Sequence, residues 1–224
     1  MTVSNTVTGA NSAYAEAYEF LRERIRDGRI ESGARIKAED IAAQLGISRM
    51  PVREAIRQLD SEGLVTIRTN RGAVVTVLNA DQVLELFQMR SVLEGLAVRR
   101  AIDNFDEEAF EELMVRLTRL DRAKSSFHEW IARHNEFHDF ICARGGAQRL
   151  FTDVQRLRTA VEPYLRIVLG PMSAGAIAEH RMLIDVIREG DPKVAEEVMR
   201  QHVLETAYDL IGLMSLKGGT PERR

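Results

Sequence analysis

Three arginines follow one another at intervals of four residues in the segment ISRMPVREAIRQL, residues 47–59. They are Arg49, Arg53 and Arg57, and in a helix this interval places their guanidinium groups on one face. The only acidic residue of the segment, Glu54, follows Arg53 directly and therefore points away from it. Positive side chains without a partner in their own segment are suited to a phosphate backbone. A solvated helix face is the alternative that this stripe alone leaves open.

Four of the five histidines also have a spacing that could serve chemistry. His134 and His138 are one helical turn apart in HNEFH, which can place two imidazoles on one metal ion. His180 and His202 lie in the last two predicted helices, and ligands from different helices can meet in the core of a helical bundle. Spacing alone leaves open the alternative that all four are ordinary surface or core histidines.

The motifs of common hydrolases are absent from the sequence. In HExxH metalloproteases the glutamate follows the first histidine directly, whereas here Asn135 has that position and Glu136 lies on another side of the helix. Phosphate-binding loops and the GxSxG and GxGxxG patterns are not found either. We therefore expect no enzyme, and a metal-dependent hydrolase fused to a DNA-binding module is the alternative function.

The arginine stripe belongs to a predicted winged helix-turn-helix domain over residues 12–78. Apolar spacing and stop signals predict three helices, of which the third begins at Arg49 and is capped by Ser48. Two β-branched runs, Val65–Ile67 and Ala73–Val77, are separated by the turn signal RTNRG and predict a small β-hairpin wing. This order of elements is typical of a domain whose third helix enters the major groove of DNA.

The histidines belong to a predicted all-α domain over residues 79–216. Six apolar-periodic segments with short Gly, Ser, Asp and Pro breaks predict an antiparallel six-helix bundle, so the predicted fold class is mainly α.

The net charge of −3 excludes DNA binding by bulk charge. The single cysteine, Cys142, excludes an internal disulfide and fits a reducing cytoplasm. No run approaches the roughly 18 apolar residues of a membrane span, so a membrane is not an expected partner.

The segment LGISRMPVREAIRQLDSEGLVTIRTNRGAVV resembles the recognition helix and wing of the GntR family of bacterial transcriptional regulators. The helices that follow resemble the FCD effector domain of one branch of that family, and the resemblance covers residues 12–215. It implies a ligand-responsive regulator, expected to be a repressor, that binds a pseudo-palindromic double-stranded DNA operator as a homodimer in the cytoplasm. The DNA-binding residues that the resemblance implies are Ser48, Arg49, Met50, Arg53, Asn70, Arg71 and Gly72.

One position departs from this family pattern. The second helix of family members often carries an arginine that touches DNA, where this sequence has Glu39. DNA phosphates repel a carboxylate at this place, and Lys37 is a nearby substitute for the missing cation. The arginine's contact is therefore not carried over to Glu39.

The FCD resemblance also implies a metal site. Members usually hold a divalent ion through an aspartate and three histidines. His134 stands at the place of the aspartate, and the three histidines match His138, His180 and His202. An imidazole in place of the carboxylate removes one negative charge, which favours Zn²⁺ or Ni²⁺ over Mn²⁺ or Mg²⁺.

The same resemblance implies a cavity beside the metal that binds a small organic acid as effector. Arg90, in FQMRSVLEGLA, matches a position where the family often places an arginine facing that cavity. A salt bridge between Arg90 and Glu94, one helical turn further on, is the alternative.

Overall fold

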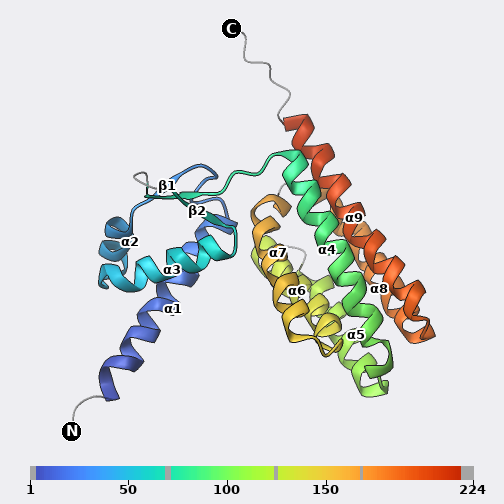
Figure 1. Ribbon diagram of the computed structural model, residues 1–224. Helices are drawn as coiled ribbons and strands as arrows, with labels where there is room; N and C mark the ends of the chain where they lie inside the picture. Colours follow the sequence, from blue (N-terminus) through green and yellow to red (C-terminus); the bar gives the residue numbers. More distant parts are fainter. Residues whose placement is uncertain (1–3, 69–71, 124–125, 167–168, 218–224) are drawn as a thin grey trace. The chain divides into compact units, whose positions relative to one another are not determined.

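The computed structural model describes residues 4–68, 72–123, 126–166 and 169–217 (Figure 1). The chain divides into two compact units, Met1–Val77 and Leu78–Arg224. The predicted fold class is confirmed, because a helix-turn-helix unit with a small sheet precedes an all-helical unit. The wing-tip residues Asn70 and Arg71, which the resemblance implies as DNA-binding, lie outside the described residues.

The described part of the first unit contains three helices and a small antiparallel sheet. The strands follow the order β1-β3-β2, and Ala73 of β3 lies opposite Ile36 of β1 and Ile67 of β2. Strands β2 and β3 form the predicted wing. The elements are α1 (Ser4–Arg26), β1 (Arg35–Ile36), α2 (Ala38–Leu45), α3 (Arg49–Ser61), β2 (Val65–Arg68) and β3 (Gly72–Val75).

Three details of this unit differ from the sequence-based prediction. Helix α1 begins at Ser4, before residue 12, where the predicted domain starts. Strand β1 was not predicted, because two residues show no periodicity and the strand forms through its pairing with β3. Ser48 stands at the N-cap of α3 with extended backbone, but its hydroxyl makes no capping hydrogen bond.

The core of the first unit decides which face of α3 is exposed. Val52, Ala55, Ile56 and Leu59 are buried in a cluster with apolar residues of α1, α2 and the sheet. Their spacing of three and four residues is typical of a helix that packs along one side. Burial of this side leaves the three arginines of the helix on the exposed side.

The described part of the second unit consists of six α-helices and a short 3-10 helix. Helix α4 begins with a capping box, in which Asn79 Oδ1 accepts a hydrogen bond from Gln82 N at 2.8 Å and Gln82 Oε1 accepts one from Asn79 N at 3.0 Å. The elements are α4 (Ala80–Ala101), η1 (Ile102–Asn104), α5 (Glu107–Arg122), α6 (Phe127–Ala143), α7 (Gln148–Leu165), α8 (Leu169–Glu189) and α9 (Pro192–Lys217).

Helix α4 packs against α9, α7 and α6, and Figure 1 shows α4 and α9 side by side. Gly95 permits the close approach of α9, because a Cβ atom there would lie 2.6 Å from Cγ of Arg200 and 3.0 Å from the carbonyl oxygen of Glu196. The buried side chains of α4 therefore reach the interior of the bundle.

No helix in the described part of the chain has both the length and the apolar character that crossing a membrane requires.

Candidate DNA-binding surface and metal centre

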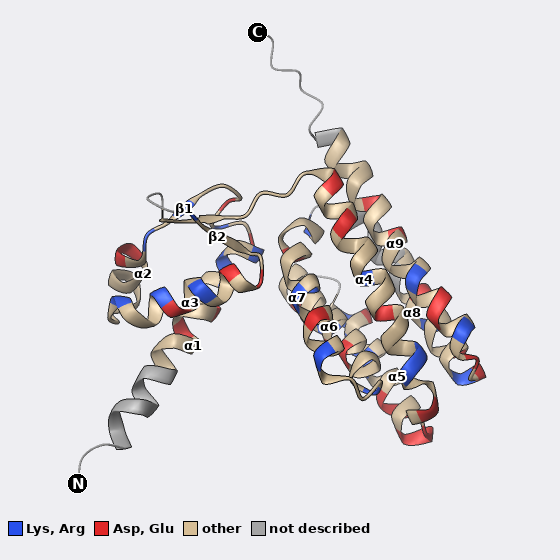
Figure 2. Ribbon diagram, viewed as in Figure 1, with Lys and Arg blue, Asp and Glu red and all other residues tan. Residues whose placement is uncertain are grey.

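Helix α3 presents basic side chains on an accessible face. The side chains of Arg49 and Arg53 are 64% and 57% exposed, and Ser48 and Arg57 are exposed as well. Met50, in the first turn, is 61% exposed. Figure 2 shows the basic positions along α3 in blue. A helix that reads DNA needs such an open face at its N-terminal end, where its side chains meet base edges.

The prediction that this stripe lacks a carboxylate neighbour is wrong for two of its members. Oε1 of Glu39, in the first turn of α2, lies 3.5 Å from Nη1 of Arg49 and 3.8 Å from Nη2 of Arg53. A hydrogen bond with its own backbone N–H, together with the charges of both arginines, lowers the pKa of Glu39. A pattern within one segment cannot indicate this contact, because Glu39 comes from another helix.

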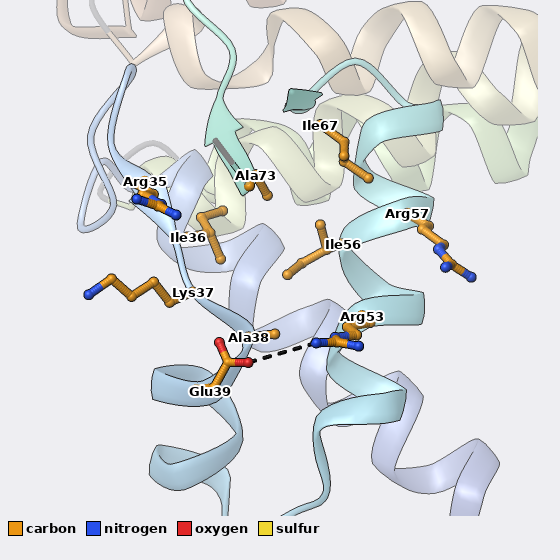
Figure 3. Close-up of a pocket in the computed structure, with 11 residues that line it drawn as sticks. Arg35, Ile36, Lys37, Ala38, Glu39, Arg53, Ile56, Arg57, Ile67 and Ala73 are labelled. Carbon is orange, nitrogen blue, oxygen red and sulfur yellow. Dashed lines mark ion pairs between the residues drawn. The ribbon is translucent and has the colours of Figure 1, made fainter. Parts of the chain in front are cut away.

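A cavity of about 360 Å³ adjoins the same face of the first unit (Figure 3). Four cationic side chains, Arg35, Lys37, Arg53 and Arg57, line it together with Glu39 and a group of apolar residues from the strands and α3. Gly72 also lines the cavity and has a φ of +75°, a backbone conformation that a side chain disfavours. The cavity combines positive charge with apolar surface, which suits a sugar–phosphate strand.

Four imidazoles converge inside the second unit. His134 and His138 come from α6, His180 from α8 and His202 from α9, and one ring nitrogen of each lies within 4.8 Å of those of the others. Nε2 of His138 and Nε2 of His180 are 3.1 Å apart. His134 is half-buried and the other three are buried. The structure thus brings together all four histidines that the sequence analysis selected as a metal site.

The donor set of this cluster fits a divalent metal ion. Zn–N distances are about 2.0–2.1 Å, so two nitrogens on one ion lie up to about 4.2 Å apart, and a small inward shift of the rings would suffice. Burial, followed by the neighbouring histidines, lowers the pKa of both His134 and His138 well below the usual value, so both rings are neutral and can act as ligands. Among the described residues, Nδ1 of His134 is buried without a hydrogen-bond partner. An unpaired buried nitrogen is unfavourable in the protein alone, and binding of an ion offsets that cost.

Glu179 fixes the orientation of one of these rings. Its Oε2 lies 3.0 Å from Nδ1 of His202, so this nitrogen donates a hydrogen bond to the carboxylate and leaves Nε2 as the lone-pair donor. The hydrogen bond from His202 lowers the pKa of Glu179. Glu179 was not among the predicted site residues, although it directly precedes His180 in the chain.

A buried group of charges lies beside the histidines. Glu94 accepts hydrogen bonds from Arg90 Nε at 3.0 Å and from Arg158 Nη2 at 2.5 Å, while Arg158 also contacts Asp139. Oε2 of Glu94 is 3.6 Å from Nδ1 of His138. Burial raises the pKa of Glu94, but the charges of Arg158 and Arg90 outweigh it and lower that pKa to about 2. The salt bridge predicted as the alternative for Arg90 is therefore present.

Two stretches of the chain match known protein families. Residues 13–75 match the family of bacterial regulatory proteins, gntR family, and residues 85–205 match the FCD domain. The chain belongs to the gntR family. It is a transcriptional regulator of the FCD type, and its matches are to transcription regulators and not to enzymes.

Individual relatives of this gntR regulator agree with that assignment. It is 30% identical over 192 residues to the "Probable D-xylose utilization operon transcriptional repressor" of Paenarthrobacter nicotinovorans, covering 84% of each chain. It is 27% identical over 201 residues to the HTH-type transcriptional repressor GlaR of Escherichia coli, covering 84% of this chain and 91% of that one. The solved structure of E. coli McbR/YncC superimposes with a TM-score of 0.76 at 21% identity, covering 88% of this chain and 96% of that one, which shows a shared fold.

Proposed function

We propose that this gntR regulator is a cytoplasmic repressor that binds a pseudo-palindromic operator as a homodimer. Its FCD domain then holds a divalent metal ion beside a site for a small organic acid. GntR regulators bind DNA operators, and their FCD domains bind small-molecule effectors. The observation that carries the proposal is that one chain combines two features. Four imidazoles from three helices lie close together in the second unit, and helix α3 of the first unit exposes a row of basic side chains.

The N-terminal end of α3 is the proposed reading element. Ser48, Arg49, Met50 and Arg53 occupy its first turns and are exposed, so they can reach base edges when the helix lies in the major groove. Arg57 lies one turn further in and is proposed to contact phosphate at most. We also propose that Asn70, Arg71 and Gly72, at the turn signal between the two β-branched runs of the sequence, contact the neighbouring groove or backbone.

Replacing Arg53 by alanine tests this assignment. If Arg53 reads a base, specific binding weakens by about 1–3 kcal/mol and preference at one position of the operator is relaxed. Thermal stability should hardly change, because the side chain is exposed. Binding can be measured by fluorescence anisotropy on a duplex selected from randomised DNA by the wild-type protein. Arg57→Ala is the comparison, and a phosphate contact there would lower affinity evenly across sequences and reduce the salt dependence. Wild-type operator binding by both Arg49→Ala and Arg53→Ala would contradict the assignment.

The proposed metal ligands are His134, His138, His180 and His202. A set of four imidazole ligands favours Zn²⁺ or Ni²⁺ over the harder ions Mn²⁺ and Mg²⁺. When bound, the ion would supply a coordination position for an effector carboxylate. The protein itself holds the four rings together inside the helical unit, and Glu179 orients the ring of His202.

Replacing Glu179 by leucine should weaken metal binding by about 10- to 100-fold, because His202 loses the acceptor that fixes its tautomer and orientation. Glu179→Gln, whose side-chain oxygen can still accept the hydrogen bond, should retain most of the affinity. Competition with a chromophoric zinc chelator measures the dissociation constants without reference to DNA binding. Equal affinities of the leucine variant and the wild type would rule out this role of Glu179.

Arg90 is the proposed cationic partner of the effector. Its Nε is paired with Glu94, so an incoming carboxylate would have to share or replace this partner. Such a rearrangement would act on α4, the helix that directly follows the wing along the chain. Effector binding can change DNA affinity only as far as it favours one arrangement of the protein over another.

The proposed dimer uses the helical unit. Met89, Val92 and Leu96 are exposed and stand at spacings of three and four residues on α4, so they form an apolar stripe on one side of that helix. A two-fold operator requires two reading helices, and one winged unit makes few contacts for specific binding on its own. If two copies bury this stripe against each other, the resulting dimer contains the second reading helix that the operator requires.

A further inference from the structure

Glu39 occupies an unusual place for an acidic residue. It stands in the first turn of α2, yet its carboxylate approaches Arg49 and Arg53 of α3, and Figure 3 shows it pointing toward Arg53 across the basic cavity. The side chain of Glu39 is 54% exposed. An anion on this surface repels the phosphates of any DNA that approaches it.

A structural role does not distinguish Glu39 from its neighbour Asp40. Ion pairs between exposed side chains contribute little to stability, because water screens them and both side chains lose freedom. The first turn of α2 also carries Asp40, which interacts favourably with the helix dipole in the same way. Asp40 lines a second cavity, which shares Arg35 and Lys37 with the first but contains neither Glu39 nor Arg53, and so provides a matched comparison for Glu39.

The pair formed by Glu39 and Arg53 matches the edge of one base pair. In the major groove a G·C pair shows two acceptors, N7 and O6 of guanine, beside one donor, the N4 amino group of cytosine. Arg53 offers two N–H donors for the guanine, and Glu39 offers an acceptor for the cytosine at a separation of 3.8 Å between the two side chains. Two helices contribute to this donor–acceptor pattern, since Arg53 belongs to α3 and Glu39 to α2.

We propose that Glu39 is a specificity-determining residue, which accepts a hydrogen bond from a cytosine amino group while Arg53 binds the guanine of the same base pair. The inference rests on the proposed placement of α3 in the major groove. Repulsion between Glu39 and phosphates lowers affinity for every sequence, and the hydrogen bond with cytosine compensates for it at the correct base pair. Glu39 thereby widens the difference between operator and unrelated DNA.

The test compares Glu39→Ala with Asp40→Ala, two variants that each remove one carboxylate from the same helical turn. Each full-length variant selects duplexes from a randomised pool, and its affinities for the wild-type-selected duplex and for a shuffled duplex are measured by anisotropy. Glu39→Ala should bind the shuffled duplex more tightly and lower the ratio of selected to shuffled affinity by about 5- to 100-fold. It should relax the same G·C position that Arg53→Ala relaxes. Asp40→Ala should change both affinities by the same factor and should select the same duplex sequence as the wild-type protein.

The outcomes separate two kinds of failure. If Glu39→Ala selects the wild-type sequence with the same affinity ratio as Asp40→Ala, the inference about Glu39 is overturned. If Arg53→Ala and Arg49→Ala both select the wild-type sequence as well, then the placement of α3 itself is wrong and the proposed function fails with it. A relaxed position in Arg53→Ala without one in Glu39→Ala leaves the proposed function intact and rejects the role of Glu39.

Discussion

The His202→Ala variant is expected to lose most of its divalent metal and the stabilisation that the metal provides. A ligand that binds the folded protein alone stabilises it by about 2.7 kcal/mol at a concentration of 100 times its dissociation constant. The wild-type melting temperature should therefore rise as Zn²⁺ or Ni²⁺ is added, whereas that of His202→Ala should stay nearly constant. Differential scanning fluorimetry of chelator-treated, untagged protein measures both. The wild-type shift should shrink as the pH falls, because protonated imidazoles do not bind metal.

His128→Ala is the matched control for this experiment. His128 is the one of the five histidines that lies outside the cluster, and it is exposed, so its removal should leave the metal-induced shift unchanged. Arg53-dependent DNA binding should persist in His202→Ala, because the two residues belong to different units. A metal-induced shift in His202→Ala equal to that of the wild type would show that the ion binds elsewhere.

Removing the carboxylate of Glu94 is expected to have the largest effect on stability. Glu94→Ala would leave Arg90 and Arg158 buried without their shared counter-ion, and breaking a buried ion pair in this way costs about 3–5 kcal/mol. The free energy of unfolding in urea, measured with a chelator present, isolates this effect from metal binding. Glu136→Ala breaks the partly exposed pair with Arg133 and should change stability little. A loss in Glu94→Ala no greater than that in Glu136→Ala would contradict the importance of the buried group.

The pH dependence of stability follows from the same carboxylate. The pKa of Glu94 is lowered from 4.5 to about 2 in the folded protein, so the folded state binds fewer protons than the unfolded chain between these values. The contribution of Glu94 to the free energy of unfolding is therefore complete above the pKa that it has in the unfolded chain. This contribution is lost as the pH falls toward the pKa that Glu94 has in the folded protein. In Glu94→Ala this part of the acid dependence should be missing.

Local periodicity explains which parts of the fold and site were predictable. The faces of α3 follow from apolar residues at three- and four-residue intervals, and HNEFH placed His134 and His138 on one side of α6. The convergence of His180 and His202 with them required the family resemblance, since no local pattern places residues of α8 and α9 beside α6. For the same reason the arginine-rich segment did not indicate the contact with Glu39, and the sequence around Arg90 did not indicate that Arg158 lies beside the same carboxylate.

Long-range contacts account for what the sequence did not show. Glu94 is paired with Arg158, which comes from α7, and a pattern within one helix contains no information about that partner. Strand β1 depends on β3 in the same way. Glu179 was the exception, because an acidic residue beside a suspected ligand, His180, was a signal that could have been followed.

The most direct test of the proposed metal centre is elemental analysis of protein purified without a chelator or a histidine tag. Four imidazoles held together in one buried site predict close to one equivalent of zinc or nickel per chain. The Glu179→Leu variant should retain less, and His202→Ala much less. If the purified protein contained less than about a tenth of an equivalent of any transition metal, and its melting temperature did not rise on adding Zn²⁺ or Ni²⁺, the cluster would not be a metal site in this regulator.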